Sequence, residues 1–241
     1  MKTLKFRPAL AQMIIDNKKT TTWRLFDDKN LQVGDVVELM NWETAEIFGR
    51  AVITEADEKP IKDLNDHDWE GHERFASDEE MFAKYREYYP GHEVGADTPV
   101  KILHFAHIED WDKDFPGVIK EVGFEFPWKE EKVWALDVPV EDMPIMELLW
   151  HFDIPFHWHD GGKYNLTSWE IIKHPDAHKN EYDRTMACDL KYPIDIMENK
   201  GRWLILDGLH RLMKAQILKM ETVKVRKVPR SKIPEILEMN Q

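Results

Sequence analysis

The sequence predicts an α+β protein with two domains, the first rich in β-strands and the second a smaller α/β domain. Its length of 241 residues fits one or two domains. Strand-like runs and two helical runs share the first 110 residues, whereas a strand, a glycine turn, a helix and a strand follow one another near the C-terminus. An apolar fraction of 42% is enough for ordinary hydrophobic cores.

The N-terminal half begins with a predicted short helix, because Pro8 precedes apolar residues at helical spacing and proline suits the first helical turn. Val33-Gly34-Asp35 is a turn signal before a strand. Ser77 is a good N-cap because acids fill the turn after it, and Pro90-Gly91 ends that helix. The predicted elements are helices over residues 8–17 and 78–89, an extended segment after 18–23, and strands over 36–40, 50–55 and 100–108. This order suggests a small barrel.

Residues 110–132 mix charges with prolines and aromatic residues, which indicates a packed connection between two domains. We therefore predict domains over residues 1–110 and 133–241, joined by 111–132. In the second domain we expect a strand over 202–206, a helix from Leu209 and a strand over 223–228. Such a βαβ unit would have a right-handed crossover.

Charge and cysteine content limit the class of partner. The net charge is −13, which argues against a general binder of nucleic-acid phosphates and against sequence-specific DNA binding. Lys and Arg predominate only in residues 1–24 and 198–241, which favours a small anionic ligand or a short RNA end. The single cysteine, the absence of a long apolar run and an N-terminus unlike a signal peptide predict a cytoplasmic protein without a membrane segment.

Lys19-Thr20-Thr21-Thr22-Trp23-Arg24 is the first candidate site. In an extended segment, Thr20, Thr22 and Arg24 share one face. A threonine needs a base to act as a nucleophile, and a lysine can be that base if burial lowers its pKa. The alternative is a strand start rich in β-branched residues next to solvated lysines.

This segment, together with Val33-Gly34-Asp35-Val36, resembles the opening of ASCH domains, which are small PUA-like β-barrels. Glu73-Arg74-Phe75 ahead of the second helix resembles the Glu-Gly-Phe segment of that family, with Arg74 where glycine is usual. The resemblance covers roughly residues 3–108. Some small members are amidohydrolases that remove the acyl group from N4-acetylcytidine, whereas others are thought to bind or cut RNA.

The resemblance implies three catalytic residues. Lys19 would be the base, Thr22 the nucleophile, and Glu73 the acid that protonates the leaving amine. Thr20 and Arg24 would contact the nucleoside or RNA. The same resemblance leaves open a protein that binds RNA or a nucleotide without chemistry and acts as a regulator.

Asp207-Gly208-Leu209-His210-Arg211 is the second candidate site. The start of the following helix and Arg211 could bind a phosphate, with Asp207 and His210 beside it, although the same residues could also be an ordinary helix corner capped by Asp207. The segment resembles the Asp-Gly-x-His-Arg motif of the ParB/sulfiredoxin fold, over about residues 134–240. Leu209 stands where sulfiredoxins have cysteine, so sulfinic-acid reduction is excluded. The remaining implication is a nucleotide site, or a small-molecule kinase that would use a nucleotide with magnesium and Asp207 as the base.

His157-Trp158-His159 is a third pattern, because two histidines at this spacing on a strand can bind zinc. No further ligand is evident at regular spacing, so we predict no metal site. The leading hypothesis is recognition, with hydrolysis, of an N4-acylated cytidine or RNA element by the first domain.

Overall fold

The computed structural model describes residues 1–26, 29–108 and 111–238. The chain divides into two compact units, Met1–Asp110 and Trp111–Gln241. Residues 111–132, expected as a connection, belong to the second unit, and the last three residues of the expected C-terminal domain lie outside the described part of the chain. None of the helices described is long and apolar enough to cross a membrane.

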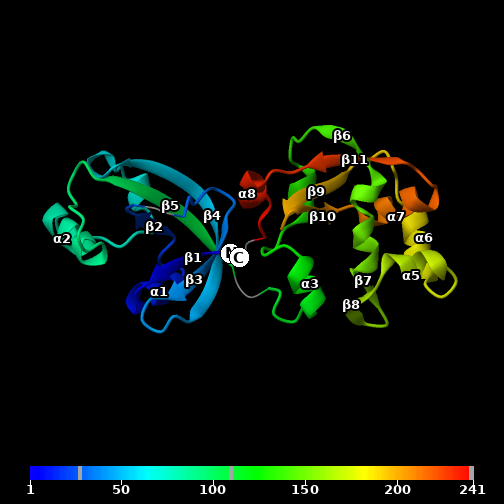
Figure 1. Cartoon of the computed structure of the whole chain (residues 1–241), viewed down its shortest axis with the longest axis horizontal. Helices are drawn as coiled ribbons and strands as arrows, with labels where there is room; N and C mark the ends of the chain where they lie inside the picture. The colour runs from blue at the N-terminus through cyan, green and yellow to red at the C-terminus, as the bar shows by residue number, and fades with distance from the viewer. Residues whose placement is uncertain (27–28, 109–110, 239–241) are drawn as a thin grey trace. The chain divides into compact units, whose positions relative to one another are not determined.

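The N-terminal unit is built on a curled five-stranded sheet with the strand order β1-β3-β4-β5-β2. β4 and β5 are its longest strands and appear as bent ribbons in Figure 1. Since β1 and β2 are the edges and no pairing joins them in the described residues, the sheet is a curled half-barrel, which is consistent with the small barrel expected from the sequence. The elements are β1 (Lys2–Phe6), α1 (Pro8–Ile15), β2 (Thr21–Arg24), β3 (Val36–Asn41), β4 (Ile47–Pro60), α2 (Asp78–Tyr88) and β5 (Pro99–Ile108).

Local sequence signals account for most of this unit. The predicted Ser77 cap is present, since its hydroxyl oxygen accepts a hydrogen bond from the backbone N–H of Glu80. The expected strand over 50–55 is longer, because β4 continues along β5 past a bulge between Ile53 and Glu55. We did not predict β1, although Leu4 and Phe6 alternate with the polar residues Thr3 and Lys5 and are both buried.

The C-terminal unit has a four-stranded sheet with the strand order β10-β9-β11-β6 and a separate two-stranded ribbon of β7 and β8. α7 packs on the larger sheet through Leu212, Met213 and Ala215, which are fully buried. The elements are α3 (Gly117–Val122), α4 (Glu130–Trp134), β6 (Val140–Pro144), β7 (His157–His159), β8 (Gly162–Leu166), α5 (Ser168–Lys173), α6 (Lys179–Ala187), β9 (Ile194–Asn199), β10 (Arg202–Asp207), α7 (Leu209–Ile217), β11 (Thr222–Lys227) and α8 (Ile233–Ile236).

The expected βαβ unit is wrong in its topology. β10 runs antiparallel to β9, and β9 runs parallel to β11, so the two strands that flank α7 are antiparallel and have β9 between them. The reason is the two-residue turn Lys200-Gly201, in which both residues have positive φ. This turn pairs β9 with β10 as a hairpin, so β11 adds on the other side of β9.

A buried histidine attaches this sheet to η4 (Leu149–Asp153). The backbone N–H of Ile205 donates to Nε2 of His151 at 3.1 Å, so Nδ1 carries the proton and donates to the Leu148 carbonyl oxygen at 2.7 Å. Burial lowers the pKa of His151 to about 4, against the smaller opposing effect of the Leu148 hydrogen bond. The folded protein therefore holds the His151 ring in its neutral form.

Acid should destabilise the C-terminal unit through this group. His151 binds a proton at a pH near 6.5 in the unfolded chain but only near 4 in the folded one, so its contribution is complete above pH 6.5 and declines as the pH falls toward 4. The expected slope is about 1.4 kcal/mol per pH unit for one such group. Urea denaturation of the wild type and of His151→Gln at pH 7.0, 6.0 and 5.0 measures it. An unchanged slope in the variant would show that His151 is not a source of the pH dependence.

Candidate functional site

Lys19 is the most buried charged side chain near the first motif. It follows α1, and the backbone N–H groups of Lys18 and Lys19 both donate to the carbonyl oxygen of Met13, which holds this turn against the end of the helix. The side chain is 1% exposed, and its Nζ forms an ion pair with the Glu73 carboxylate. A buried ammonium requires such a partner.

Glu73 is brought to Lys19 by the loop that precedes α2. The carbonyl oxygen of Gly71 accepts hydrogen bonds from the backbone N–H groups of Thr20 and Thr21, at 3.0 and 3.2 Å. Gly71 has φ +69°, and a Cβ atom there would lie 2.0 Å from the hydroxyl oxygen of Thr20. Glycine is therefore needed both for the turn and for this close approach.

Burial and charge act together on the pair. Burial lowers the pKa of Lys19, and the neighbouring Glu73 carboxylate only partly opposes this effect. Burial alone would raise the pKa of Glu73, but the attraction of Lys19 and His72 and the hydrogen bond from Lys19 outweigh it, so that the pKa is lowered. His72 stacks on Trp23 at a ring distance of 4.0 Å, and burial followed by the charge of Lys19 lowers its pKa to about 4.

Glu73 opens onto a cavity of about 600 Å³. Thr22 and Arg24, two apart on β2, line this cavity together with Glu73. Lys19 does not line the cavity; it forms its ion pair with Glu73, which does. Thr22 is buried, and within the described residues no hydrogen bond joins its hydroxyl to Lys19. Aromatic side chains contribute to the wall, namely Phe6, Trp23, Phe26, Trp42, Tyr85, Tyr88 and Tyr89.

Arg24, which lines this cavity, has a hydrogen-bond donor that no described residue uses. One terminal guanidinium nitrogen donates to the carbonyl oxygen of Lys5 at 3.1 Å, and the guanidinium carbon lies 4.9 Å from the centre of the Phe6 ring. Its Nε is buried, and no residue in the described part of the chain accepts a hydrogen bond from it. A buried donor that has no protein partner is free to bind an oxygen or nitrogen atom of a ligand.

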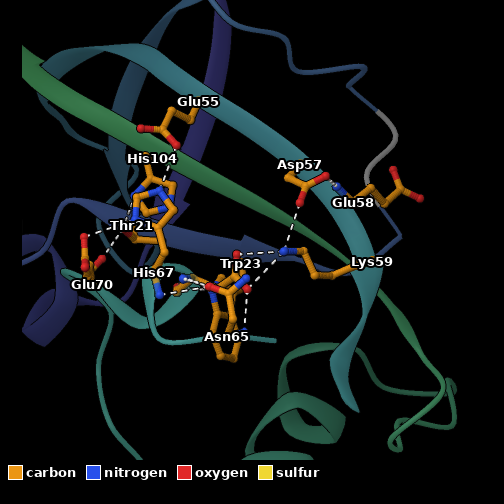
Figure 2. A network of polar contacts seen from close by, with 11 residues as sticks. Thr21, Trp23, Glu55, Asp57, Glu58, Lys59, Asn65, His67, Glu70 and His104 are labelled. Atoms are coloured by element: carbon orange, nitrogen blue, oxygen red, sulfur yellow. Dashed lines mark hydrogen bonds and ion pairs between the residues drawn. The ribbon is translucent and has the colours of Figure 1, made fainter. Parts of the chain in front are cut away.

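Thr20 and Thr21 do not face the cavity. Thr20 precedes β2, and its hydroxyl lies against Gly71 and not on the face that Thr22 and Arg24 share. Thr21 is fully buried; its hydroxyl donates to the Glu70 carbonyl oxygen and lies 2.9 Å from Nδ1 of His104 (Figure 2). Of the three threonines, only Thr22 can therefore meet a ligand in the cavity.

Sequence reasoning missed the histidines around this site. Figure 2 shows His67 beside His104, with the rings stacked at 4.6 Å. The two nitrogens of His67 each contact a carboxylate, Glu55 at 2.9 Å and Glu70 at 3.1 Å, and these hydrogen bonds raise its pKa. Glu55, His67 and His104 lie on separate elements, so no local spacing could have indicated that they meet.

The second predicted motif joins the end of β10 to the start of α7. Gly208 is the N-cap of α7 and has φ +111°, where a side chain would be strained and would also meet Arg211. Asp207 does not cap the helix. Its carboxylate accepts hydrogen bonds from Arg211 at 2.9 Å and from the indole N–H of Trp134 at 2.7 Å. Burial, with a smaller contribution from Arg184, lowers the pKa of His210 to about 4, so its ring is neutral.

No protein-family model matches the sequence, and no curated protein matches it. Several solved structures are similar to this chain. Protein EF3133 from Enterococcus faecalis V583 is 14% identical, covers 42% of this chain over 70% of its own length, and has a TM-score of 0.37. The ASCH domain from Lactobacillus crispatus JV V101 is 19% identical over 41% of this chain and 70% of its own, with a TM-score of 0.30.

The structural neighbours include ASCH-domain proteins. Sulfiredoxin from Arabidopsis thaliana is also similar, at 19% identity over 39% of this chain and 92% of its own, with a TM-score of 0.23. None of these likenesses assigns a role to a residue of this chain. The chemistry must come from the residues themselves.

Proposed function

We propose that the N-terminal unit binds a modified nucleoside, free or at an RNA end, and hydrolyses the amide of an N4-acylated cytosine. The observation that carries this proposal is the buried Lys19–Glu73 pair next to a cavity that Thr22 and Arg24 line. The aromatic wall suits the flat face of a base, and the guanidinium of Arg24, a residue that lines the cavity, suits one of its polar edges. The resemblance of these residues to the ASCH motif supplies the substrate class.

The Lys19–Glu73 pair can provide both a base and an acid while the total number of protons on the two groups stays the same. Moving one proton from Lys19 to Glu73 converts the ion pair into a neutral amine and a carboxylic acid, and burial acts on both groups in that direction. The amine can then take the proton of Thr22 while the acid protonates N4 of the leaving cytidine. Water hydrolyses the resulting threonyl ester, releases the carboxylic acid and restores the hydroxyl.

A second candidate is binding without chemistry. It is favoured by one observation, that in the described residues the Thr22 hydroxyl makes no hydrogen bond to Lys19. An unactivated threonine is a poor nucleophile. In that case the same cavity would hold the modified base unchanged.

Turnover of N4-acetylcytidine by the wild type and by Thr22→Val tests the proposal. The wild type should release cytidine and acetate, whereas the variant, which keeps the shape but not the hydroxyl, should lose at least about 100-fold in rate and still bind the nucleoside. Chromatography of the products and calorimetric binding measure the two effects. Binding by the wild type without turnover would favour the second candidate, and full activity in Thr22→Val would contradict the role of Thr22.

A further inference from the structure

Three potential metal ligands meet in the C-terminal unit, from elements far apart in the sequence. His157 comes from β7, Glu181 from α6 and His210 from α7. A Glu181 carboxylate oxygen (Oε2) lies 3.7 Å from Nδ1 of His157 and 3.5 Å from Nε2 of His210, and the three ligand atoms lie within 4.8 Å of one another. Metal–ligand bonds of about 2 Å imply ligand separations of roughly 3.3 Å in a tetrahedral site, so little adjustment is needed.

The tautomer of His210 leaves an unshared lone pair in this group. The Thr185 hydroxyl lies 2.8 Å from the Glu181 carbonyl oxygen, which can only accept, and 3.0 Å from Nδ1 of His210. With its one proton on the carbonyl oxygen, the hydroxyl accepts from Nδ1–H of His210. Nε2 of His210 is then unprotonated and faces the Glu181 carboxylate. Two acceptors that face each other repel unless a cation lies between them.

His157 is arranged in the same way. Its Nε2 lies 2.9 Å from the hydroxyl of Ser168, which is fully buried and can accept the ring proton, and Nδ1 is then free to face Glu181. Histidines that bind a metal regularly give their other N–H to such a neighbour, which sets the tautomer.

The group is open on one side. His157, Glu181 and His210 all line a cavity of about 590 Å³, which Arg184 and Asp207 also line. Two imidazoles and one carboxylate with an open position are a ligand set that zinc and ferrous iron share. The positive charge of Arg184 repels a cation at this site, and the negative charge of Glu181 offsets that repulsion.

We propose that His157, Glu181 and His210 bind one divalent transition-metal ion of the zinc type, with its open position toward the cavity. This site is separate from the nucleoside cavity of the N-terminal unit and does not depend on its function. It also differs from a zinc site made by His157 and His159, because His159 lies beside Asp160 and His178 and not with His157. The other His/Glu group, around His67, is less suited because both ring nitrogens of His67 already contact carboxylates.

Metal binding to the full chain tests the site. Protein freed of metal by a chelator is titrated with zinc by calorimetry and with cobalt by visible absorption. We expect one ion per chain in the wild type, a loss of affinity greater than 100-fold in Glu181→Gln and His210→Gln, and a loss of about 10- to 100-fold in Thr185→Val, which removes the hydroxyl that contacts His210 and the Glu181 carbonyl oxygen but no metal ligand.

Two matched controls locate the ion. His159→Gln alters the neighbouring exposed histidine and His67→Gln alters the other cluster, and both should bind zinc as the wild type does. Circular dichroism checks that each variant is folded. A wild type that binds no zinc, unchanged affinity in folded Glu181→Gln, or loss of binding in His67→Gln would each overturn the proposal.

Discussion

Replacing Lys19 by methionine should lower the free energy of unfolding of the N-terminal unit by about 3 kcal/mol, because Glu73 then keeps a buried charge without its partner. The pKa of Glu73 should rise in this variant, since Lys19 is the largest of the attractions that oppose the effect of burial. Native-state hydrogen exchange of amides in β3 and β5 measures the stability of this unit alone.

The double variant and a neighbouring lysine supply the controls. Lys19→Met with Glu73→Gln removes both charges and should recover most of the loss, as replacements of whole buried pairs commonly do. Lys18→Met alters a lysine whose side chain is 69% exposed and whose one ion pair among the described residues is with Asp16, so a change within about 1 kcal/mol is expected. Additive single and double effects would show that Lys19 and Glu73 do not interact.

Replacing Glu73 by glutamine should lower the turnover of N4-acetylcytidine by about 100- to 10,000-fold, the usual range for a general acid. Glutamine keeps the size of the side chain but cannot hand a proton to the leaving amine. The readout is the rate of cytidine release at saturating substrate. The double variant Lys19→Met with Glu73→Gln separates a loss of turnover from a loss of stability, because it should be stable and yet inactive.

Glu87 is the matched control for this variant. It also lines the cavity, but it is exposed and hydrogen bonded to Lys84, so Glu87→Gln should keep the rate within about twofold. If Glu73→Gln were as active as Glu87→Gln, the acid role of Glu73 would have to be abandoned.

The candidate site was accessible to sequence reasoning only in part. Lys19, Thr22 and Arg24 lie close together in the chain, so their pattern could be read directly. Glu73 is 54 residues from Lys19 and was reached only through the family resemblance. Neither pattern could reveal that Thr20 faces Gly71 or that Asp207 accepts a hydrogen bond from Trp134, because those contacts depend on how separate segments pack.

Short-range signals alone determined several elements of this protein. The proline that opens α1, the Ser77 cap of α2 and the glycine turn before α7 act within a few residues, so their effect can be read from neighbours in the chain.

The tertiary structure decided the order of the strands, the burial of Lys19 and the meeting of His157, Glu181 and His210. Each of these results from contacts between residues far apart in the sequence. Burial then sets the charge states, because desolvation acts only on groups that packing removes from water.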